Sequence, residues 1–309
     1  MNQLVIEKTD QAVKILQEKG MDLWLTFVRE TSAGGDPILS LIYGDADLTW
    51  QSVLILTAKN EKIAIVGRFE LATTEAIGAY DTIIPYDESI KPSLLQVLER
   101  TDPKQVAINF SENDVLSDGL SYGLYQLLLA MIENSPYKDR IESAEPVITA
   151  LRGRKTKTEI ERIKAAIDST LQIYDQVFLI IKPGLTEIEF ARWMQTKVEE
   201  YGFGFAWPKN NNPAVNSGPE SPVGHNAPTE ISVQPGHLLH FDFGIKQAGY
   251  CSDIQRMAYI LKEGEDQAPE PVIKGFTTIV KAIRAAFAAI QPGLPAYEVD
   301  QAARNIVTR

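Results

Sequence analysis

A repeated pattern in the second half of the chain constrains its fold most. The segment KPGLTEIEFARWMQ, which starts at Lys182, aligns with QPGLPAYEVDQAARN, which starts at Gln291. Each copy follows a stretch of helical apolar periodicity, breaks at Pro-Gly, and resumes as a helix with acidic residues near its start. The pattern predicts two helical hairpins related by a pseudo-twofold. A loop and two strand-like runs follow the first copy, whereas the second reaches Arg309 before any strand, so we expect a truncated second repeat.

A chain of 309 residues is longer than one average domain. Its first half alternates strand-like and helix-like stretches, such as a strand over Leu23–Val28 and a hairpin formed by Val53–Thr57 and Lys62–Val66. We therefore expect an α/β domain over residues 1–149 and an α+β domain over residues 150–309. The first domain shows no catalytic motif, so its expected role is structural, or to wall one side of a site in the second.

Helix-start signals place three helices. Thr9 can cap a helix that runs to Lys19, just before Gly20. Two Thr-x-x-Glu patterns are typical of capping boxes: Thr158 with Glu161, and Thr186 with Glu189. The first pattern predicts the start of the long helix that opens the second domain.

Charge and cysteine content exclude several classes of protein. The net charge of −11 and the pI near 4.9 argue against nucleic acid or an anionic membrane as a partner, because both require a basic surface. The single cysteine, Cys251, rules out an internal disulfide framework and fits a reducing compartment. No signal-peptide pattern opens the sequence, so we expect a cytoplasmic protein.

The segment His237–Ile260 predicts a β-hairpin with an acidic pair. If Ile245 pairs with Tyr250 across a four-residue turn, Asp242 lies directly opposite Asp253 on one face. Two carboxylates placed among apolar side chains repel and are costly to bury, and a pair of divalent cations would offset that cost. Three alternatives stay open: one aspartate faces solvent, one pairs with Arg256 or Lys246, or a one-residue slip separates the pair.

The three histidines of the chain have competing interpretations. His225 lies in the Gly/Pro/Asn-rich segment NSGPESPVGHNAPTE and is either an incidental surface residue or a contact to a substrate carbonyl. His237 and His240 are rivals for that role. Strand alternation puts His240 on the face of Asp242, as a ligand or, by our preference, as a packed core residue. Cys251 shares the face of Asp253, but no histidine base supports a cysteine nucleophile.

Taken in order, these motifs resemble those of metallo-aminopeptidases, Xaa-Pro aminopeptidases and prolidases, which share the creatinase/aminopeptidase "pita-bread" fold. The segments are ALRGRKTKTEIERIKAA from Ala150, SGPESPVGHNAP, HFDFGIKQAGYCSDIQRMAYI and QPGLPAYEVDQAAR. The resemblance covers residues 150–309. The first half is similar to the creatinase-type N-terminal domain only in its α/β pattern.

The resemblance implies a site with two divalent metal ions (Mn, Co or Zn) and five ligands. Asp242 and Asp253 match the first two ligands, with Asp253 bridging, and His225 matches the histidine that contacts the scissile peptide. One histidine and two glutamates that complete the set have no counterpart before Arg309, so the chain as written is expected to be inactive. The implied reaction is hydrolysis of the first peptide bond of a peptide whose second residue is proline. In it the metals activate a bridging water and polarise the carbonyl, while a ligand glutamate takes the proton.

Two functions remain open at this stage. The N-terminal domain favours the Xaa-Pro branch over methionine aminopeptidases, and the aspartate pair argues against a creatinase, which lacks the metals. The alternative is a non-catalytic pita-bread module that binds peptides or proteins. The expected partner is a peptide with proline at its second position, and a homodimer is compatible with the sequence.

Overall fold

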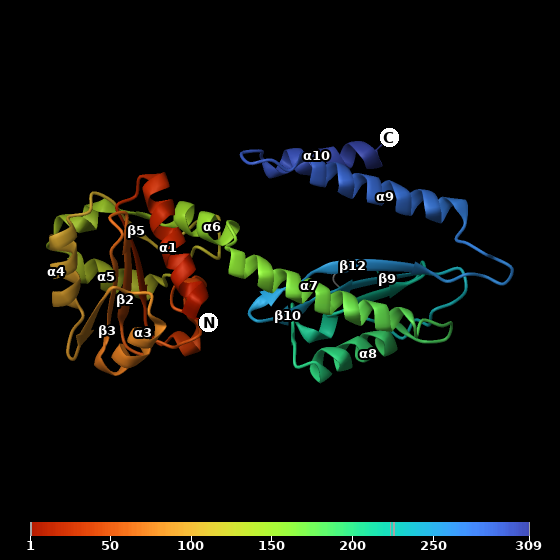
Figure 1. Ribbon diagram of the computed structural model, residues 1–309, viewed down its shortest axis with the longest axis horizontal. Helices are drawn as coiled ribbons and strands as arrows, with labels where there is room; N and C mark the ends of the chain where they lie inside the picture. The colour runs from red at the N-terminus through yellow and green to blue at the C-terminus, as the bar shows by residue number, and fades with distance from the viewer. Residues whose placement is uncertain (1, 223, 225, 309) are drawn as a thin grey trace. The chain divides into compact units, whose positions relative to one another are not determined.

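The computed structural model describes residues 2–222, 224 and 226–308, and these divide into two compact units. The units comprise residues 1–161 and 162–309, and each is treated by itself (Figure 1). Helix α7 (Lys157–Phe178) begins in the first unit and continues in the second. In the described part of the chain, no helix has the length and apolar character needed to cross a membrane.

The first unit is built on a six-stranded mixed sheet of order β4-β3-β2-β1-β5-β6. The strands are β1 (Leu23–Val28), β2 (Ser52–Thr57), β3 (Lys62–Gly67), β4 (Thr82–Tyr86), β5 (Val106–Ile108) and β6 (Ile141–Ser143). Neighbours β1–β2 and β2–β3 are antiparallel, and the other pairs are parallel. Every residue of β1, β2 and β3 is buried, which explains why these strands read as nearly continuous apolar runs.

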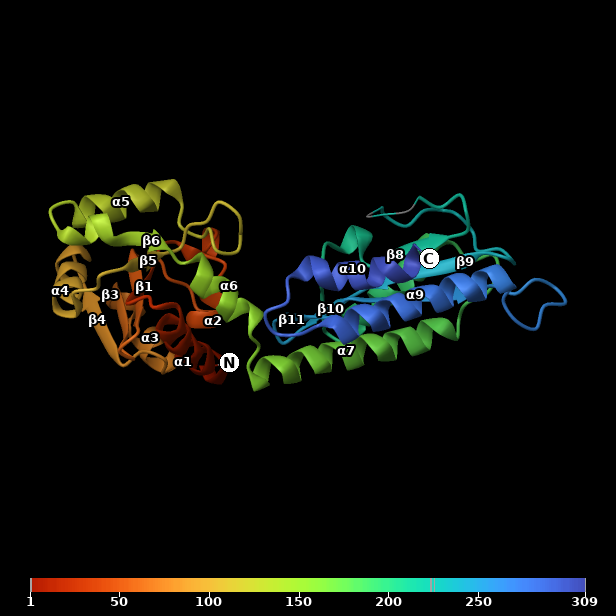
Figure 2. The same cartoon turned by 90° about the horizontal axis from the view of Figure 1, so that it is seen from above.

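Helices cover both faces of this sheet (Figures 1 and 2). One face packs against α1 (Asn2–Lys19), α2 (Leu39–Ile42), α3 (Leu71–Ile77) and α6 (Glu145–Gly153), and the other against α4 (Lys91–Thr101) and α5 (Tyr122–Ile132). The 3₁₀ turns in the described part of the chain are Thr31–Ala33, Arg68–Glu70, Pro136–Arg140 and Lys209–Asn211. The helix predicted to start at Thr9 begins at Asn2 instead, because Leu4 and Val5 extend its buried stripe.

The start of α7 differs from the prediction. Its capping box is formed by Thr156 and Glu159: Thr156 N donates to Glu159 Oε2 (2.7 Å) and Glu159 N donates to Thr156 Oγ1 (3.3 Å). Buried Lys8 selects this register, because its Nζ lies 3.0 Å from the same carboxylate. Burial lowers the pKa of Lys8, and Glu159 opposes that effect. Thr158, the predicted cap, instead donates to Glu7 Oε1 at 2.8 Å.

In the second unit, helices α7 and α8 (Glu187–Glu200) cover one face of a sheet of order β12-β9-β8 (Figure 1). Its strands are β8 (Ala214–Ser217), β9 (Leu238–Phe243) and β12 (Ile254–Tyr259). A smaller sheet joins β7 (Gly204–Phe205), β10 (Ile245–Gln247) and β11 (Tyr250–Cys251). Alternate residues of β9, namely Leu239, Phe241 and Phe243, enter the core under the helices.

Both helical hairpins predicted from the repeat are present. The turn at Pro183-Gly184 joins α7 to α8, and the turn at Pro292-Gly293 joins α9 (Glu270–Ala289) to α10 (Ala296–Val307). The predicted capping box of Thr186 with Glu189 opens α8. Helices α9 and α10 lie side by side in both views (Figures 1 and 2). These helices leave large apolar side chains exposed: Phe276, Ile279, Ile283, Phe287, Tyr297 and Val307.

Candidate metal centre

The acidic pair lies on a hairpin whose register differs from the predicted one. Gln247 pairs with Tyr250, so the turn consists of Ala248 and Gly249 alone, with φ of 49° and 83°. Positive φ at both positions is the geometry of a tight type I′ turn. The predicted four-residue turn is therefore wrong, and Asp242 lies opposite Gln255 rather than opposite Asp253.

The correction shifts the pairing by two residues and so keeps the two aspartates on one face. Side chains repeat every second residue along a strand, and only an odd shift would have separated them. Asp242 is half-buried, Asp253 is exposed, and the two carboxyl groups are within hydrogen-bonding reach. Burial, followed by the negative charge of Asp253, raises the pKa of Asp242 above its ordinary value.

The Asp242 carboxyl is only partly satisfied. Its Oδ1 is buried and has no hydrogen-bond partner among the described residues. Within that same part of the chain, no lysine or arginine forms an ion pair with either aspartate, so the alternative with Arg256 or Lys246 is not what the structure shows. A buried carboxylate oxygen without a donor beside a second carboxylate suits a cation. No group of three or more His, Cys, Asp or Glu among residues 2–222, 224 and 226–308 has the arrangement of a metal site.

A chain of polar side chains extends from Asp242 across the sheet. Gln255 Nε2 donates to Asp242 Oδ2 (3.2 Å), and Gln255 Oε1 lies 3.2 Å from His240 Nε2. His240 Nδ1 in turn lies 3.1 Å from Asn216 Oδ1, and Asn216 Nδ2 donates to the carbonyl of Pro222 (2.8 Å). The tautomer of the His240 ring decides which of its two nitrogens donates in these contacts.

His240 is not the core residue that we preferred from the sequence. Leu239 and Phe241 fill the core, so strand alternation turns His240 to the opposite, polar face, where it is half-buried. Asn216 and Gln255 are members of this polar face that sequence reasoning missed. Their place follows from the pairing of Asn216 with His240 and of Gln255 with Asp242. A two-residue turn ending at Gly249 sets the register that pairs Gln255 with Asp242, so this turn is the signal that could have identified Gln255.

The loop that carries His225 begins beside this face. His225 itself lies outside the described residues. The segment before it leaves β8 through Gly218, which has φ of +72°, and a Cβ there would lie 2.6 Å from the ring of His237. His237 Nδ1 also lies 3.1 Å from Ser217 Oγ. The structure thus assigns His237 to the base of the loop, away from the aspartate pair.

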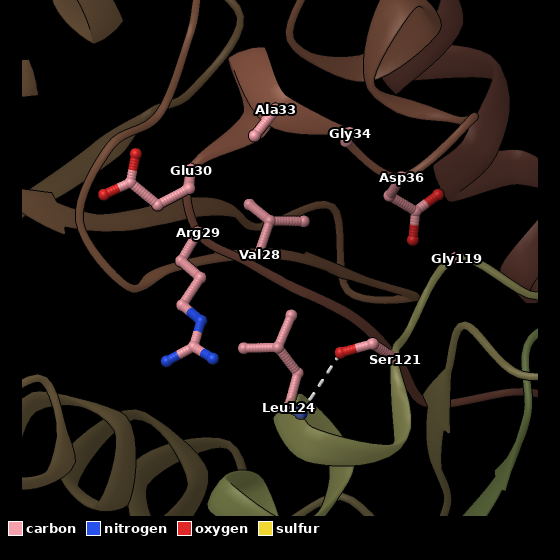
Figure 3. A pocket seen from close by; sticks show the side chains of 10 residues that line it. Val28, Arg29, Glu30, Ala33, Gly34, Asp36, Gly119, Ser121 and Leu124 are labelled. Atoms are coloured by element: carbon pink, nitrogen blue, oxygen red, sulfur yellow. Dashed lines mark hydrogen bonds between the residues drawn. The ribbon is translucent and has the colours of Figure 1, made fainter.

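A separate cavity of about 240 Å³ lies in the first unit, beyond the carboxyl end of β1 (Figure 3). Ser121 caps α5 at its edge, and Arg29 points away from Asp36. Asp36 accepts from Ile38 N (3.0 Å) and Asn109 Nδ2 (2.7 Å), and burial raises its pKa. No histidine or cysteine is among the described residues that line the cavity.

Comparison with solved structures shows which class of fold this is. The chain matches an Xaa-Pro dipeptidase from Bacillus anthracis with a TM-score of 0.68 at 20% identity, covering 98% of this chain and 77% of that one. It matches a putative aminopeptidase P from the same organism with a TM-score of 0.73 at 18% identity, covering 98% and 75%. The predicted fold class, an α/β N-terminal domain followed by a pita-bread domain, is confirmed.

Sequence comparison gives the family. A putative Xaa-Pro aminopeptidase of Mycoplasma pneumoniae is 28% identical over 158 residues, which are 51% of this chain and 43% of that protein. An uncharacterised peptidase of Staphylococcus saprophyticus is 29% identical over 164 residues, 53% of this chain and 45% of that protein. The chain thus spans less than half the length of these curated relatives. Residues 161–309 match the model of metallopeptidase family M24, which supports the predicted family.

Proposed function

We propose that this protein is a metal-dependent peptidase that releases the N-terminal residue from peptides with proline at the second position. The M24 match supports the hydrolase class, and the names of the relatives support the Xaa-Pro substrate. A dipeptide and a longer peptide are both within the proposed substrate class, since the structural relatives include a dipeptidase and an aminopeptidase.

The paired carboxyl groups of Asp242 and Asp253 carry this proposal. They crowd two acidic groups together, leave Asp242 Oδ1 buried without a donor, and raise the pKa of Asp242. A divalent cation would replace that repulsion by attraction, and two aspartates are suitable oxygen ligands for Mn, Co or Zn. When bound, such an ion supplies a water of lowered pKa and polarises a substrate carbonyl.

The protein's own residues divide the remaining work. Asp242 and Asp253 would hold the ions. Gln255 on β12 orients the Asp242 carboxyl, and His240 on β9 contacts Gln255 in turn. His225 would contact the scissile carbonyl. Asn216 ties the loop before His225 to the polar face through its bond to Pro222.

The number of donors limits what the chain does alone. Two aspartates offer at most four oxygens, whereas two divalent ions with bridging ligands and water need roughly twice that. We therefore expect weak metal binding and little turnover from the 309-residue chain by itself, with further donors required for full activity.

Calorimetric titration with MnCl₂, CoCl₂ and ZnCl₂ tests the proposal, with the double variant Asp242→Asn/Asp253→Asn alongside. Metal binding that is lost in the double variant is the expected result, and equal binding by both proteins would refute the assigned site. Release of the first residue from an Xaa-Pro peptide, against an Xaa-Ala peptide as control, tests the substrate. Peptide binding that ignores both metal and the asparagine substitutions would favour the non-catalytic module instead.

A further inference from the structure

The first turn of α8 contains a fully buried carboxylate that serves two distant points of the chain. Glu187 has 0% of its surface exposed. Its Oε1 accepts from Ser217 N at 2.7 Å, and its Oε2 accepts from Thr229 N at 2.9 Å and Thr229 Oγ1 at 2.7 Å. Glu187 therefore binds the two residues that flank the segment 218–228, which is called the 218–228 loop below.

Glu187 acts as an acceptor in all of these hydrogen bonds. Ile231 N donates to Thr229 Oγ1 (3.2 Å), so the hydroxyl proton of Thr229 is free to point at the carboxylate. Glu187 then accepts from three donors and donates to none. The positive end of the α8 dipole favours an acceptor at this position.

The backbone of α8 joins the same junction. Glu187 N donates to Ile231 O and Ile188 N donates to Thr229 O, each at 3.1 Å. These are N–H groups of the first helical turn, which have no partner inside the helix. The start of α8 and the end of the 218–228 loop thus satisfy each other, and Glu187 adds the start of the loop to the same anchor.

The anchored loop lies next to the acidic pair. It leaves β8, whose Ala214 pairs with Asp242 and whose Asn216 pairs with His240 on the adjacent strand β9. Asn216 reaches into the loop, where it donates to Pro222 O (2.8 Å) and Ser221 Oγ (3.2 Å). The loop is therefore tied both to the polar face of the sheet and, through Glu187, to the helix layer on the other face.

We propose that Glu187 is a positioning residue that holds both ends of the 218–228 loop, to which His225 belongs in the sequence, beside the strands that carry the polar face. The role of His225 in this statement rests on the proposed function. Capping of α8 does not explain Glu187, because the capping box is formed by Thr186 and Glu189. A polar side chain is buried at a cost, and here Glu187 joins two chain segments through three hydrogen bonds.

Three single substitutions test how strongly Glu187 holds the 218–228 loop. Glu187→Gln preserves the volume but leaves an amide N–H₂ facing a backbone donor, so one end of the loop loses its acceptor. Thr229→Val removes one of the three donors. Glu189→Gln is the matched control, because it makes the same chemical change in the same helical turn at an exposed side chain that binds Thr186 N (2.7 Å).

Hydrogen exchange followed by mass spectrometry is the main measurement, made on the full 309-residue chain. Glu187→Gln should speed exchange of peptides spanning 217–229 at least tenfold relative to peptides from β9, and Thr229→Val about threefold. Glu189→Gln should leave that ratio unchanged. Equal effects of Glu187→Gln and Glu189→Gln, or acceleration spread evenly over the second unit, would overturn the proposal. If Glu187→Gln does not fold, Thr229→Val against Glu189→Gln decides the question.

Kinetics separate this inference from the function on which it rests. Under metal-loaded conditions that give measurable Xaa-Pro hydrolysis, Glu187→Gln should lower kcat at least tenfold while the metal affinity and KM stay within twofold. A parallel rise in KM with unchanged kcat would contradict a positioning role. If the exchange pattern appears as expected but the wild-type chain and Asp242→Asn/Asp253→Asn bind metal equally, the anchoring by Glu187 stands and the proposed function fails.

Discussion

The two faces of the sheet β12-β9-β8 contrast sharply within a single strand. On one face of β9, Leu239, Phe241 and Phe243 are fully buried under α7 and α8. On the other, His240 and Asp242 are half-buried and bound to side chains rather than packed. Successive residues of β9 thus alternate between side chains that pack in the core and polar side chains of the candidate site.

This difference shows where the molecule tolerates unfavourable groups. The apolar face contains aromatic rings in edge-to-face contact, a favourable arrangement. The polar face contains two carboxyl groups in close approach and a buried oxygen without a partner. Proteins keep such locally unfavourable sites where they have a function, so substitutions on the two faces should have opposite consequences.

The largest expected effect is on the apolar face. Phe241→Ala removes a ring that contacts the rings of Tyr174, Phe178 and Phe190, and should lower the free energy of unfolding by about 3–5 kcal/mol. His240→Ala, one residue away on the polar face, should cost about 1 kcal/mol or less, because its hydrogen bonds are partly exposed. Urea unfolding of both variants measures the contrast. Similar losses for the two would show that the faces are not energetically distinct.

The next effect concerns turnover rather than folding. Where hydrolysis is measurable, His225→Ala should reduce kcat by roughly 10²-fold or more, because a group proposed to contact the reacting carbonyl is lost. Metal content, measured by inductively coupled plasma spectrometry, should stay unchanged. Loss of metal in this variant would reassign His225 as a ligand.

Metal should stabilise the folded protein through the polar face alone. A ligand that binds only the folded state adds about 2.7 kcal/mol at a hundredfold excess over its Kd. We expect the Tm to rise on addition of MnCl₂, and this rise to vanish in Asp242→Asn/Asp253→Asn. Asp168→Asn, at an exposed position of α7, is the matched control and should respond like the wild type. An unchanged response of the double variant would place the metal elsewhere.

Local signals were sufficient for much of the fold. β1 spans Leu23–Val28 as predicted, and the Thr186 capping box forms as its spacing indicated. The two Pro-Gly turns also lie where the repeat put them. These features depend on signals between residues close in the sequence, namely the spacing of apolar residues, the helix caps and the turn-forming residues.

Features that depend on competing local patterns were not predictable. Thr156 and Thr158 both begin a Thr-x-x-Glu pattern, and only the distant Lys8, bound to Glu159, selects the first. The hairpin turn needs positive φ at Ala248, which alanine rarely adopts, so the sequence favoured a longer turn.

The candidate site was predicted only in part. Asp242 and Asp253 lie on one face because an error of two residues preserves strand alternation. The roles of Asn216, Gln255 and Glu187 depend on which segments meet, and no periodicity encodes that.

The smallest expected effect is a pH dependence that belongs to the polar face. The pKa of Asp242 is raised in the folded protein above the value near 3.8 of an unperturbed carboxyl. At pH values between 3.8 and the raised pKa of folded Asp242, the folded state binds more protons than the unfolded state. The free energy of unfolding therefore falls as the pH rises through this window.

The comparison of wild type with Asp242→Asn in EDTA isolates this contribution, since other groups, including Asp36 with its raised pKa, are common to both. Above the window, Asp242→Asn should be more stable than wild type by about 1 kcal/mol or less, the size of a like-charge pair on adjacent strands. Below it the advantage should disappear, because the wild-type carboxyl is protonated. Saturating metal should reverse the order, since the cation stabilises the ionised pair and has no such ligand in the variant. A variant less stable than wild type at neutral pH in EDTA would mean that the Gln255–Asp242 hydrogen bond outweighs the repulsion, and the polar face would then be a stabilising element like its apolar counterpart.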